Sequence, residues 1–261
     1  MNNKLIEKFA EGFFNTFYNG CWSGDTQYSI SDLSVHESYA VQDLVTKRKT
    51  ARGERTVGYK IGCTSSAIQS QFGLNEPIFG RLFKPHIFNE GKELNWKSYV
   101  NCAIEPEMVL KIGNDLEGEN LTDKTLISAI EYVSPGIEIH NFKFWFNPPT
   151  LQELICSNGI HAGLIVGSSK SSPDKLSFES ELFKVYKDDK IITEAIASEI
   201  MGGPLHSLRW LTEKLTKQNE ILRAGSLVIP GSPVELINIC EDTKLKIFIE
   251  KVGEAAAYFK T

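Results

Sequence analysis

Cysteine is scarce in this sequence and never paired. The five cysteines are widely spaced, with no CxxC pair and no Cys/His cluster at the spacing of a zinc site: Cys21, Cys63, Cys102, Cys156 and Cys240. An odd number of scattered cysteines argues against a disulfide framework and against a structural zinc site, and it is typical of a reducing compartment. We therefore expect free, mostly buried thiols in a cytoplasmic protein.

Long apolar runs and basic stripes are missing too. No run approaches the roughly eighteen uninterrupted apolar residues of a membrane span, and the first helix-like segment already carries Lys4, Glu7, Lys8 and Glu11. We expect no targeting or membrane segment. The net charge is −5, with basic residues scattered among acidic ones, which argues against nucleic acid as a partner. A small ligand, including an anionic one, stays open.

The first fifty or so residues have a helical pattern. Leu5, Phe9 and Phe13 recur at helical spacing, and this apolar stripe is typical of plain core packing. Ser34 and Glu37 have the spacing of a capping box, so a second helix should begin there and run toward residue 52. We predict a helical N-terminal segment over residues 1–55, packed on a single catalytic core over residues 56–261.

Beyond residue 55 the pattern changes to short β-like runs separated by Gly, Pro and Asn turns. Strands are expected over residues 57–61, 100–112, 135–140, 162–167, 182–187, 190–197, 226–230, 234–239 and 244–251. Helices are expected over residues 65–72, 122–132 and 205–218, the second capped by Thr122. Strands outnumber helices without alternating strictly with them, so we predict an α+β fold with a mixed sheet or β-roll core.

Two carboxylates share one face of the run 100–112. Period-two alternation places Glu105 and Glu107 beside the apolar Ala103 and Val109. Pro106 cannot donate a ladder hydrogen bond, so this piece is expected at an edge or rim of the sheet. Glutamates on a strand face are commonly solvated, and that alternative stays open.

A third carboxylate lies between two β-branched residues, at Ile137, Glu138 and Ile139. A carboxylate so close to a core is costly unless it is paired or bound to a metal. Three carboxylates with no nitrogen or sulfur ligand would suit Mg²⁺ or Mn²⁺, whereas zinc favours His or Cys. The alternative is that Glu138 points outward or pairs with a lysine or arginine.

Lys60 has a glycine on each side of it along its strand face. Gly58 and Gly62 remove side chains that would block a ligand approaching the lysine. A solvated surface lysine is the alternative. The histidines have no ligand spacing, which favours structural roles for His140, His161 and His206.

Together these segments resemble the hydratase/decarboxylase family of aromatic meta-cleavage pathways, which includes 2-oxopent-4-enoate hydratase and 4-oxalocrotonate decarboxylase and has the fumarylacetoacetase-type fold. The matching segments follow the family's order over most of the chain: residues 38–42, 58–65, 75–80, 105–107, 137–139, 202–205, 210–211, 224–228 and 231–232.

The resemblance implies a Mg²⁺ (or Mn²⁺) ion on Glu105, Glu107 and Glu138, with Lys60 as a catalytic residue beside the substrate. The implied substrate is a small unsaturated 2-oxo acid, whose carboxylate and 2-oxo oxygens chelate the ion while a metal-stabilised dienolate forms. Lys60 would orient the carboxylate or shuttle a proton, with its pKa lowered by a cationic neighbourhood. A homo-oligomer is implied as well.

The same resemblance places Ser157, Asn158 and Ser232 at substrate-binding positions. It also exposes departures, because the positions of Ile78, Asn141 and Ser157 are acidic in many hydratases of the family. Adding water to a double bond needs an acid and a base, whereas decarboxylation needs mainly an electron sink and a proton donor.

We therefore predict a metal-dependent lyase, with 4-oxalocrotonate-type decarboxylation favoured over 2-oxopent-4-enoate-type hydration. A non-catalytic partner subunit of the same fold is a further alternative. A fumarylacetoacetase-type C–C hydrolase is the weakest alternative: it needs a base-activated water, and His36 and Glu37 are adjacent only in sequence.

Overall fold

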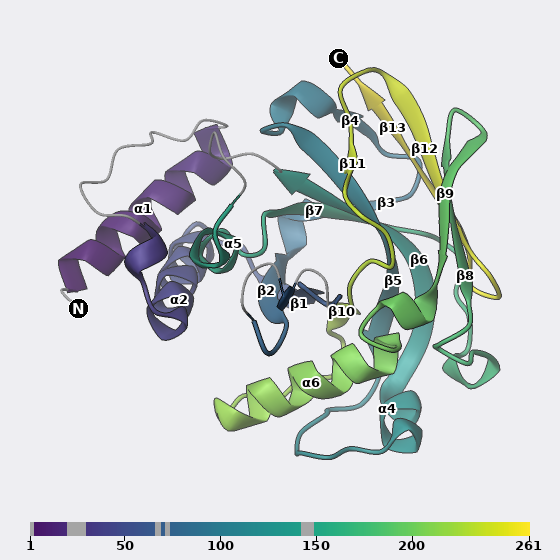
Figure 1. Cartoon of the computed structure of the whole chain (residues 1–261), viewed down its shortest axis with the longest axis horizontal. Helices are drawn as coiled ribbons and strands as arrows, with labels where there is room; N and C mark the ends of the chain where they lie inside the picture. Colours follow the sequence, from purple (N-terminus) through teal and green to yellow (C-terminus); the bar gives the residue numbers. More distant parts are fainter. Residues whose placement is uncertain (1–2, 20–29, 66–68, 71–73, 142–148) are drawn as a thin grey trace.

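The structure is a computed structural model that describes residues 3–19, 30–65, 69–70, 74–141 and 149–261. Two β-sheets form its centre, and helices pack around them (Figure 1). The larger sheet has the order β2-β1-β10-β5-β6-β7-β3, and a short strand, β11, also pairs with β5. Its strands are β1 (Thr56–Gly62), β2 (Ile78–Phe83), β3 (Ile87–Asn89), β5 (Cys102–Ile112), β6 (Ile130–Asn141), β7 (His161–Val166), β10 (Leu227–Ile229) and β11 (Ile237–Asn238).

The smaller sheet has the order β4-β13-β12-β8-β9. Its strands are β4 (Glu93–Asn95), β8 (Leu182–Lys187), β9 (Lys190–Ile196), β12 (Thr243–Ile249) and β13 (Gly253–Lys260). The pairs β1–β10, β3–β7 and β4–β13 are parallel, and the other pairs are antiparallel. The predicted α+β class with mixed sheets is therefore confirmed. A shared core of apolar side chains from both sheets includes Ile104, Met108, Ile137, Ile247 and Phe259.

The helices begin where the sequence offers caps. Ser34 and Glu37 form the predicted capping box, with Glu37 N donating to Ser34 Oγ at 3.2 Å and Ser34 N donating to Glu37 Oε2 at 2.9 Å. Thr122 caps the next helix, and the last begins at Pro204, directly after Gly203. The helices are α1 (Asn3–Asn19), α2 (Val35–Ala51), α4 (Asp123–Ala129), α5 (Leu151–Cys156) and α6 (Pro204–Lys217), with 3-10 turns at Ile30–Asp32, Lys84–His86, Trp96–Ser98, Pro173–Lys175 and Ala197–Glu199.

The two N-terminal helices lie together at one end of the molecule, beside α5 (Figure 1). Phe9 and Phe13 of α1 and Val41 of α2 share an apolar cluster with Ile78 of β2 and Ile155 of α5. The helices thus pack at the end of the larger sheet formed by its edge strand β2. The division at residue 55 stays a prediction. Among the described residues, no helix is long and apolar enough to cross a membrane.

Several boundaries differ from the sequence prediction. The helix expected over 122–132 ends at Ala129, and β6 takes over at Ile130. Strands β2, β3, β4 and β13 and helix α5 were not predicted. The helix expected over 65–72 falls mostly on residues outside the described ones. Asp188 and Asp189, which separate the strands expected over 182–187 and 190–197, form the tip of the β8–β9 hairpin, with φ values of 47° and 65°.

Lys49 of α2 is buried against aromatic rings. Its Nζ lies 3.1 Å from the centroid of the Phe17 ring and 4.7 Å from that of Phe83, and the residue is 3% exposed. Burial lowers the pKa of Lys49 to about 7, opposed by the charge of Glu54. An unfolded lysine has a pKa near 10.4, so the folded chain binds fewer protons between these values, and its free energy of unfolding rises with pH across that window.

Replacing Lys49 with methionine should therefore stabilise the protein at neutral pH. The ring faces offset part of the burial cost of the ammonium, so we expect a gain of about 2 kcal/mol near pH 7 that shrinks toward pH 10. Urea unfolding of wild type and K49M at pH 6.5 and 9.5 measures it. The control is K47M, because Lys47 is exposed on the same helix. A K49M protein less stable than wild type at pH 6.5 would contradict the prediction.

Candidate metal centre

The predicted carboxylates come from two neighbouring strands. Glu105 and Glu107 lie on β5, and the register of the antiparallel β5–β6 pair places Glu138 directly opposite Glu105. Side chains opposite each other on such a pair have Cβ atoms about 5 Å apart, and diagonal ones are still within reach. Small residues make room around them, since Gly136 is opposite Glu107 and Ala103 is opposite His140.

The expectation that Pro106 lies at an edge or rim holds on only one side of β5, which is not an edge strand. β5 pairs with β6 along its length, including Pro106 with Ile137. On its other side it pairs with β11 at Ala103 and Ile104 and with β10 at Leu110 and Lys111. The glutamates therefore occupy the stretch where this second side has no partner strand, and the proline falls within that gap.

The carboxylates are not solvated. Glu107 and Glu138 are 0% exposed, and the side chain of Glu105 is 22% exposed. Glu107 Oε2 accepts a hydrogen bond from Gly231 N at 3.1 Å, whereas its Oε1 is buried with no hydrogen-bond partner among the described residues. Burial, reinforced by the charges of Glu138 and Glu105, raises the pKa of Glu107 well above its usual value.

Lys60 projects from β1 into the same space and is also buried. Its Nζ lies 3.3 Å from Glu138 Oε1 and donates to Gly159 O at 3.3 Å. Burial works against the ammonium, but the neighbouring carboxylates, Glu138 foremost, outweigh it and raise the pKa of Lys60. The expected lowering of this pKa requires a bound cation and stays a prediction, since the protein groups around the lysine are anionic. The alternative that Glu138 pairs with a lysine holds as well.

The flanking glycines serve different purposes. A Cβ on Gly58 would lie 1.8 Å from Leu227 O, so this glycine allows β10 to approach β1. A Cβ on Gly62 would lie 3.3 Å from Lys60 Nζ, and one on Gly159 would lie 3.0 Å from it. Only Gly62 of the predicted pair keeps space beside the ammonium, and Gly159 does the same from the other side.

Two histidines that were expected to be structural, His140 and His161, contact Glu138. His140 Nε2 lies 3.0 Å from Glu105 Oε2 and 3.4 Å from Glu138 Oε2, and His161 Nδ1 lies 2.8 Å from Glu138 Oε1. Burial alone would raise the pKa of Glu138, but the charges of His140 and Lys60 hold it well below its usual value. The available signal was period two, because His140 follows Glu138 by two residues on β6.

This donor set fits a divalent cation. One ligand atom from each of Glu105, Glu138 and His140 lies within 4.8 Å of the others. Glu107 Oε1 is a buried oxygen with no hydrogen-bond partner among the residues the structure describes, and the buried Glu138 Oε2 has only the longer, 3.4 Å contact with His140 Nε2. Buried carboxylate oxygens in this condition are costly unless a cation neutralises them. The predicted set of Glu105, Glu107 and Glu138 therefore remains the proposed carboxylate ligand set, with His140 beside it.

The predicted substrate-binding side chains are engaged by the backbone. Asn158 Oδ1 accepts from Arg81 N at 2.6 Å, and its Nδ2 donates to Arg81 O at 2.9 Å. Ser157 Oγ donates to Leu154 O at 3.2 Å. Ser232 Oγ donates to Val234 O at 2.9 Å. Their substrate contacts stay predictions.

A hollow of about 500 Å³ lies on the Thr64 side of the centre, and none of the carboxylates of the centre lines it. It is lined by Thr64, Glu76, Glu199 and Trp210 among others. A Cβ on Gly231 would lie 2.8 Å from the Thr64 side chain, and Gly231 N is the group that binds Glu107. Thr64, one residue of its lining, thus lies beside the glycine that donates to Glu107.

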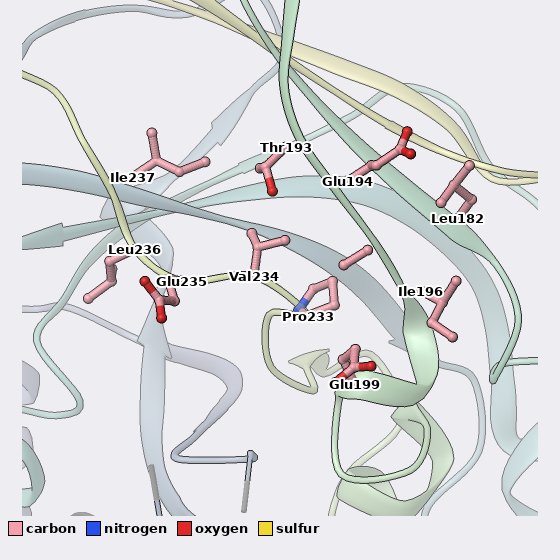
Figure 2. Close-up of a pocket in the computed structure, with 11 residues that line it drawn as sticks. Leu182, Thr193, Glu194, Ile196, Glu199, Pro233, Val234, Glu235, Leu236 and Ile237 are labelled. Carbon is pink, nitrogen blue, oxygen red and sulfur yellow. The ribbon is translucent and has the colours of Figure 1, made fainter. Parts of the chain in front are cut away.

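A second hollow, of about 740 Å³, lies between β9 and the segment 233–237 (Figure 2). None of its lining residues is a predicted site residue.

Sequence comparisons find relatives over nearly the whole chain, although no family model matches. A 2-keto-4-pentenoate hydratase of Paraburkholderia xenovorans (strain LB400) is 25% identical over 261 residues, covering 100% of this chain and 97% of that protein. A 4-oxalocrotonate decarboxylase of a Pseudomonas species is 28% identical over 221 residues, covering 85% of each.

Solved structures give the same fold. A 4-oxalocrotonate decarboxylase from Pseudomonas putida G7, complexed with magnesium and adipate, superposes with a TM-score of 0.93 at 22% identity, covering 99% of this chain and 98% of that one. A fumarylpyruvate hydrolase from Pseudomonas aeruginosa, complexed with Mn²⁺ and pyruvate, has a TM-score of 0.61 at 15% identity, covering 78% and 89%. The predicted resemblance to the hydratase/decarboxylase family, and its fumarylacetoacetase-type fold, are therefore confirmed.

Proposed function

We propose that this protein is a metal-dependent lyase for a small unsaturated 2-oxo acid, with decarboxylation of the 4-oxalocrotonate type as its reaction. The observation that carries the proposal is the clustering of the buried Glu107 and Glu138 with Glu105, in which Glu107 Oε1 has no hydrogen-bond partner among the described residues and the Lys60 ammonium lies beside Glu138. The names of the relatives, which include hydratases and a 4-oxalocrotonate decarboxylase, support the same class of reaction.

The centre would hold Mg²⁺ or Mn²⁺ on the three carboxylates, and such an ion supplies a Lewis acid for the 2-oxo group. The chain's own residues orient the substrate and neutralise its charge. Lys60 is held as an ammonium by Glu138 and Gly159, so it acts as a cation and hydrogen-bond donor for a substrate carboxylate, and not as a general base. Its burial strengthens each of these interactions.

The residues at the three positions that are acidic in many hydratases favour decarboxylation over hydration. Asn141 Oδ1 accepts from Val100 N at 2.9 Å, and Ser157 Oγ is bonded to the backbone. Ile78 is packed in the apolar cluster with α1 and α2. None of these three positions supplies the acid or base that adding water requires. Breaking the bond to a departing carbon dioxide needs only an electron sink and the return of a proton.

An assay with two substrates tests the proposal. Purified protein with Mg²⁺ or Mn²⁺ should release carbon dioxide from a 2-hydroxymuconate-type diacid, and it should leave the diene absorbance of 2-hydroxypentadienoate unchanged. Turnover of the pentadienoate with no carbon dioxide from the diacid would establish the hydratase alternative, which the relatives named as hydratases support. Metal binding with turnover of neither substrate would favour the non-catalytic partner subunit.

The proposal also covers the cellular compartment of the enzyme and its oligomeric state. We infer a cytoplasmic enzyme because the four cysteines in the described part of the chain, Cys63, Cys102, Cys156 and Cys240, are free thiols. We infer a homo-oligomer because β9 is the last strand of its sheet and exposes Ile191, Ile192 and Ile196.

A further inference from the structure

His140 places a nitrogen among the oxygens of the candidate centre. The side chain is 1% exposed, and its Nε2 lies 3.0 Å from Glu105 Oε2 and 3.4 Å from Glu138 Oε2. Two neighbouring ligand atoms on one octahedral ion, each about 2.1 Å from it, are separated by roughly 3 Å. The two distances from Nε2 are thus close to those between ligands sharing one ion, and the three ligand atoms all lie within 4.8 Å of one another.

Resting on the proposed metal-dependent function, we infer that His140 Nε2 is itself a ligand and that the centre prefers Mn²⁺ or a later first-row divalent ion over Mg²⁺. Mg²⁺ prefers oxygen ligands and sheds its waters reluctantly, whereas imidazole suits the later divalent ions. An imidazole in the set therefore changes which ion the site selects.

An ion bound at Nε2 requires a neutral imidazole, although His140 is charged beside Glu138 when no ion is bound. Glu105, Glu107 and Glu138 carry three negative charges when ionised, and Lys60 with a dication carries three positive ones. A neutral His140 completes the set without adding charge. A protonated His140 would instead place an imidazolium next to the dication, in a buried space where like charges repel strongly.

The rival role for His140 is that of a donor that only orients carboxylates. His161 already has that role, because its Nδ1 lies 2.8 Å from Glu138 Oε1. The two histidines are register partners on β6 and β7, yet only His140 reaches two carboxylates. His140 Nδ1 has no acceptor among the residues the structure describes, so no protein contact there fixes the tautomer against ion binding at Nε2.

Spectroscopy on the wild-type protein distinguishes the two roles. Metal-free protein is loaded with Mn²⁺ alone, and pulsed EPR is used to look for hyperfine coupling from a directly bound ¹⁴N. Competition between Mn²⁺ and Mg²⁺ is followed through the signal of free Mn²⁺. The variants are H140A and H140Q, with H161A as the matched control that removes the orienting contact to Glu138.

Wild type should show the ¹⁴N coupling and a preference for Mn²⁺ on the order of tenfold or more. H140A and H140Q should lose the coupling and most of that preference. H161A should keep the ¹⁴N coupling and the preference for Mn²⁺. Its affinity for both ions should fall equally, by about ten to a hundredfold. Tight Mn²⁺ binding without ¹⁴N coupling in wild type would overturn the inference and leave the proposed function standing, whereas no binding of either ion would remove the proposed function itself.

Discussion

Replacing Glu138 with glutamine should abolish divalent metal binding and reduce turnover of the 2-oxo acid by roughly 10³-fold or more, since Lewis-acid stabilisation supplies several kcal/mol. Glu138 contacts three ionisable side chains of the centre: its carboxylate lies 3.3 Å from Lys60 Nζ, 2.8 Å from His161 Nδ1 and 3.4 Å from His140 Nε2. An amide keeps the volume of the side chain but removes the charge. Isothermal titration with Mn²⁺ and a carbon dioxide assay measure the two effects.

The matched control is Glu131→Gln, since Glu131 is exposed and lies on the same strand. It should bind metal and turn over substrate as wild type does. Because Glu138→Gln leaves Lys60 buried beside an uncharged group, thermal unfolding must show that the variant is folded at the assay temperature. A folded Glu138→Gln protein with wild-type affinity for Mn²⁺ would refute the carboxylate centre.

Local patterns identified most elements that have an unambiguous period or cap. The capping box at Ser34 and the hairpin tip at Asp188 depend on neighbouring residues alone, so the sequence suffices for them. The sequence did not predict the junction between α4 and β6, because residues 121–134 contain no Gly or Pro that would mark the end of the helix. β13 was missed because the alanines that it buries, such as Ala255, have weak strand propensity, and its place is fixed by pairing with β12 and β4.

The site depends on register, which local pattern does not contain. Alternation placed Glu105 and Glu107 on one face, but nothing local to either strand says that Glu138 is opposite Glu105. The family resemblance supplied that convergence. It supplied nothing about His140, although its two-residue spacing from Glu138 on a predicted strand was enough to place both on one face. His140 has no zinc-ligand spacing to another histidine or cysteine, because its partners are carboxylates: Glu138 on its own strand and Glu105 on β5.

Replacing Lys60 with methionine should separate metal binding from catalysis. The ammonium lies 3.3 Å from Glu138 Oε1, a proposed ligand, so it would compete electrostatically with a bound dication, and K60M should bind Mn²⁺ at least as tightly as wild type. Turnover should fall by about 10²–10³-fold, because the donor that orients and neutralises a substrate carboxylate is lost. Titration calorimetry and the carbon dioxide assay measure these two quantities on the same preparation.

The same substitution should have the opposite effect on the metal-free protein, which it should destabilise. Without the Lys60 charge, the buried Glu105, Glu107 and Glu138 repel one another unopposed, so metal-free K60M should unfold at a lower temperature than metal-free wild type. Mn²⁺ should then raise its midpoint by more than it raises that of wild type, because binding relieves a larger repulsion. Lys111→Met is the control, since Lys111 lies on β5 and bonds Gly225 O instead of a carboxylate. If K60M loses Mn²⁺ affinity and turnover together while remaining folded, Lys60 shapes the carboxylate cluster and is not a group that acts on the substrate.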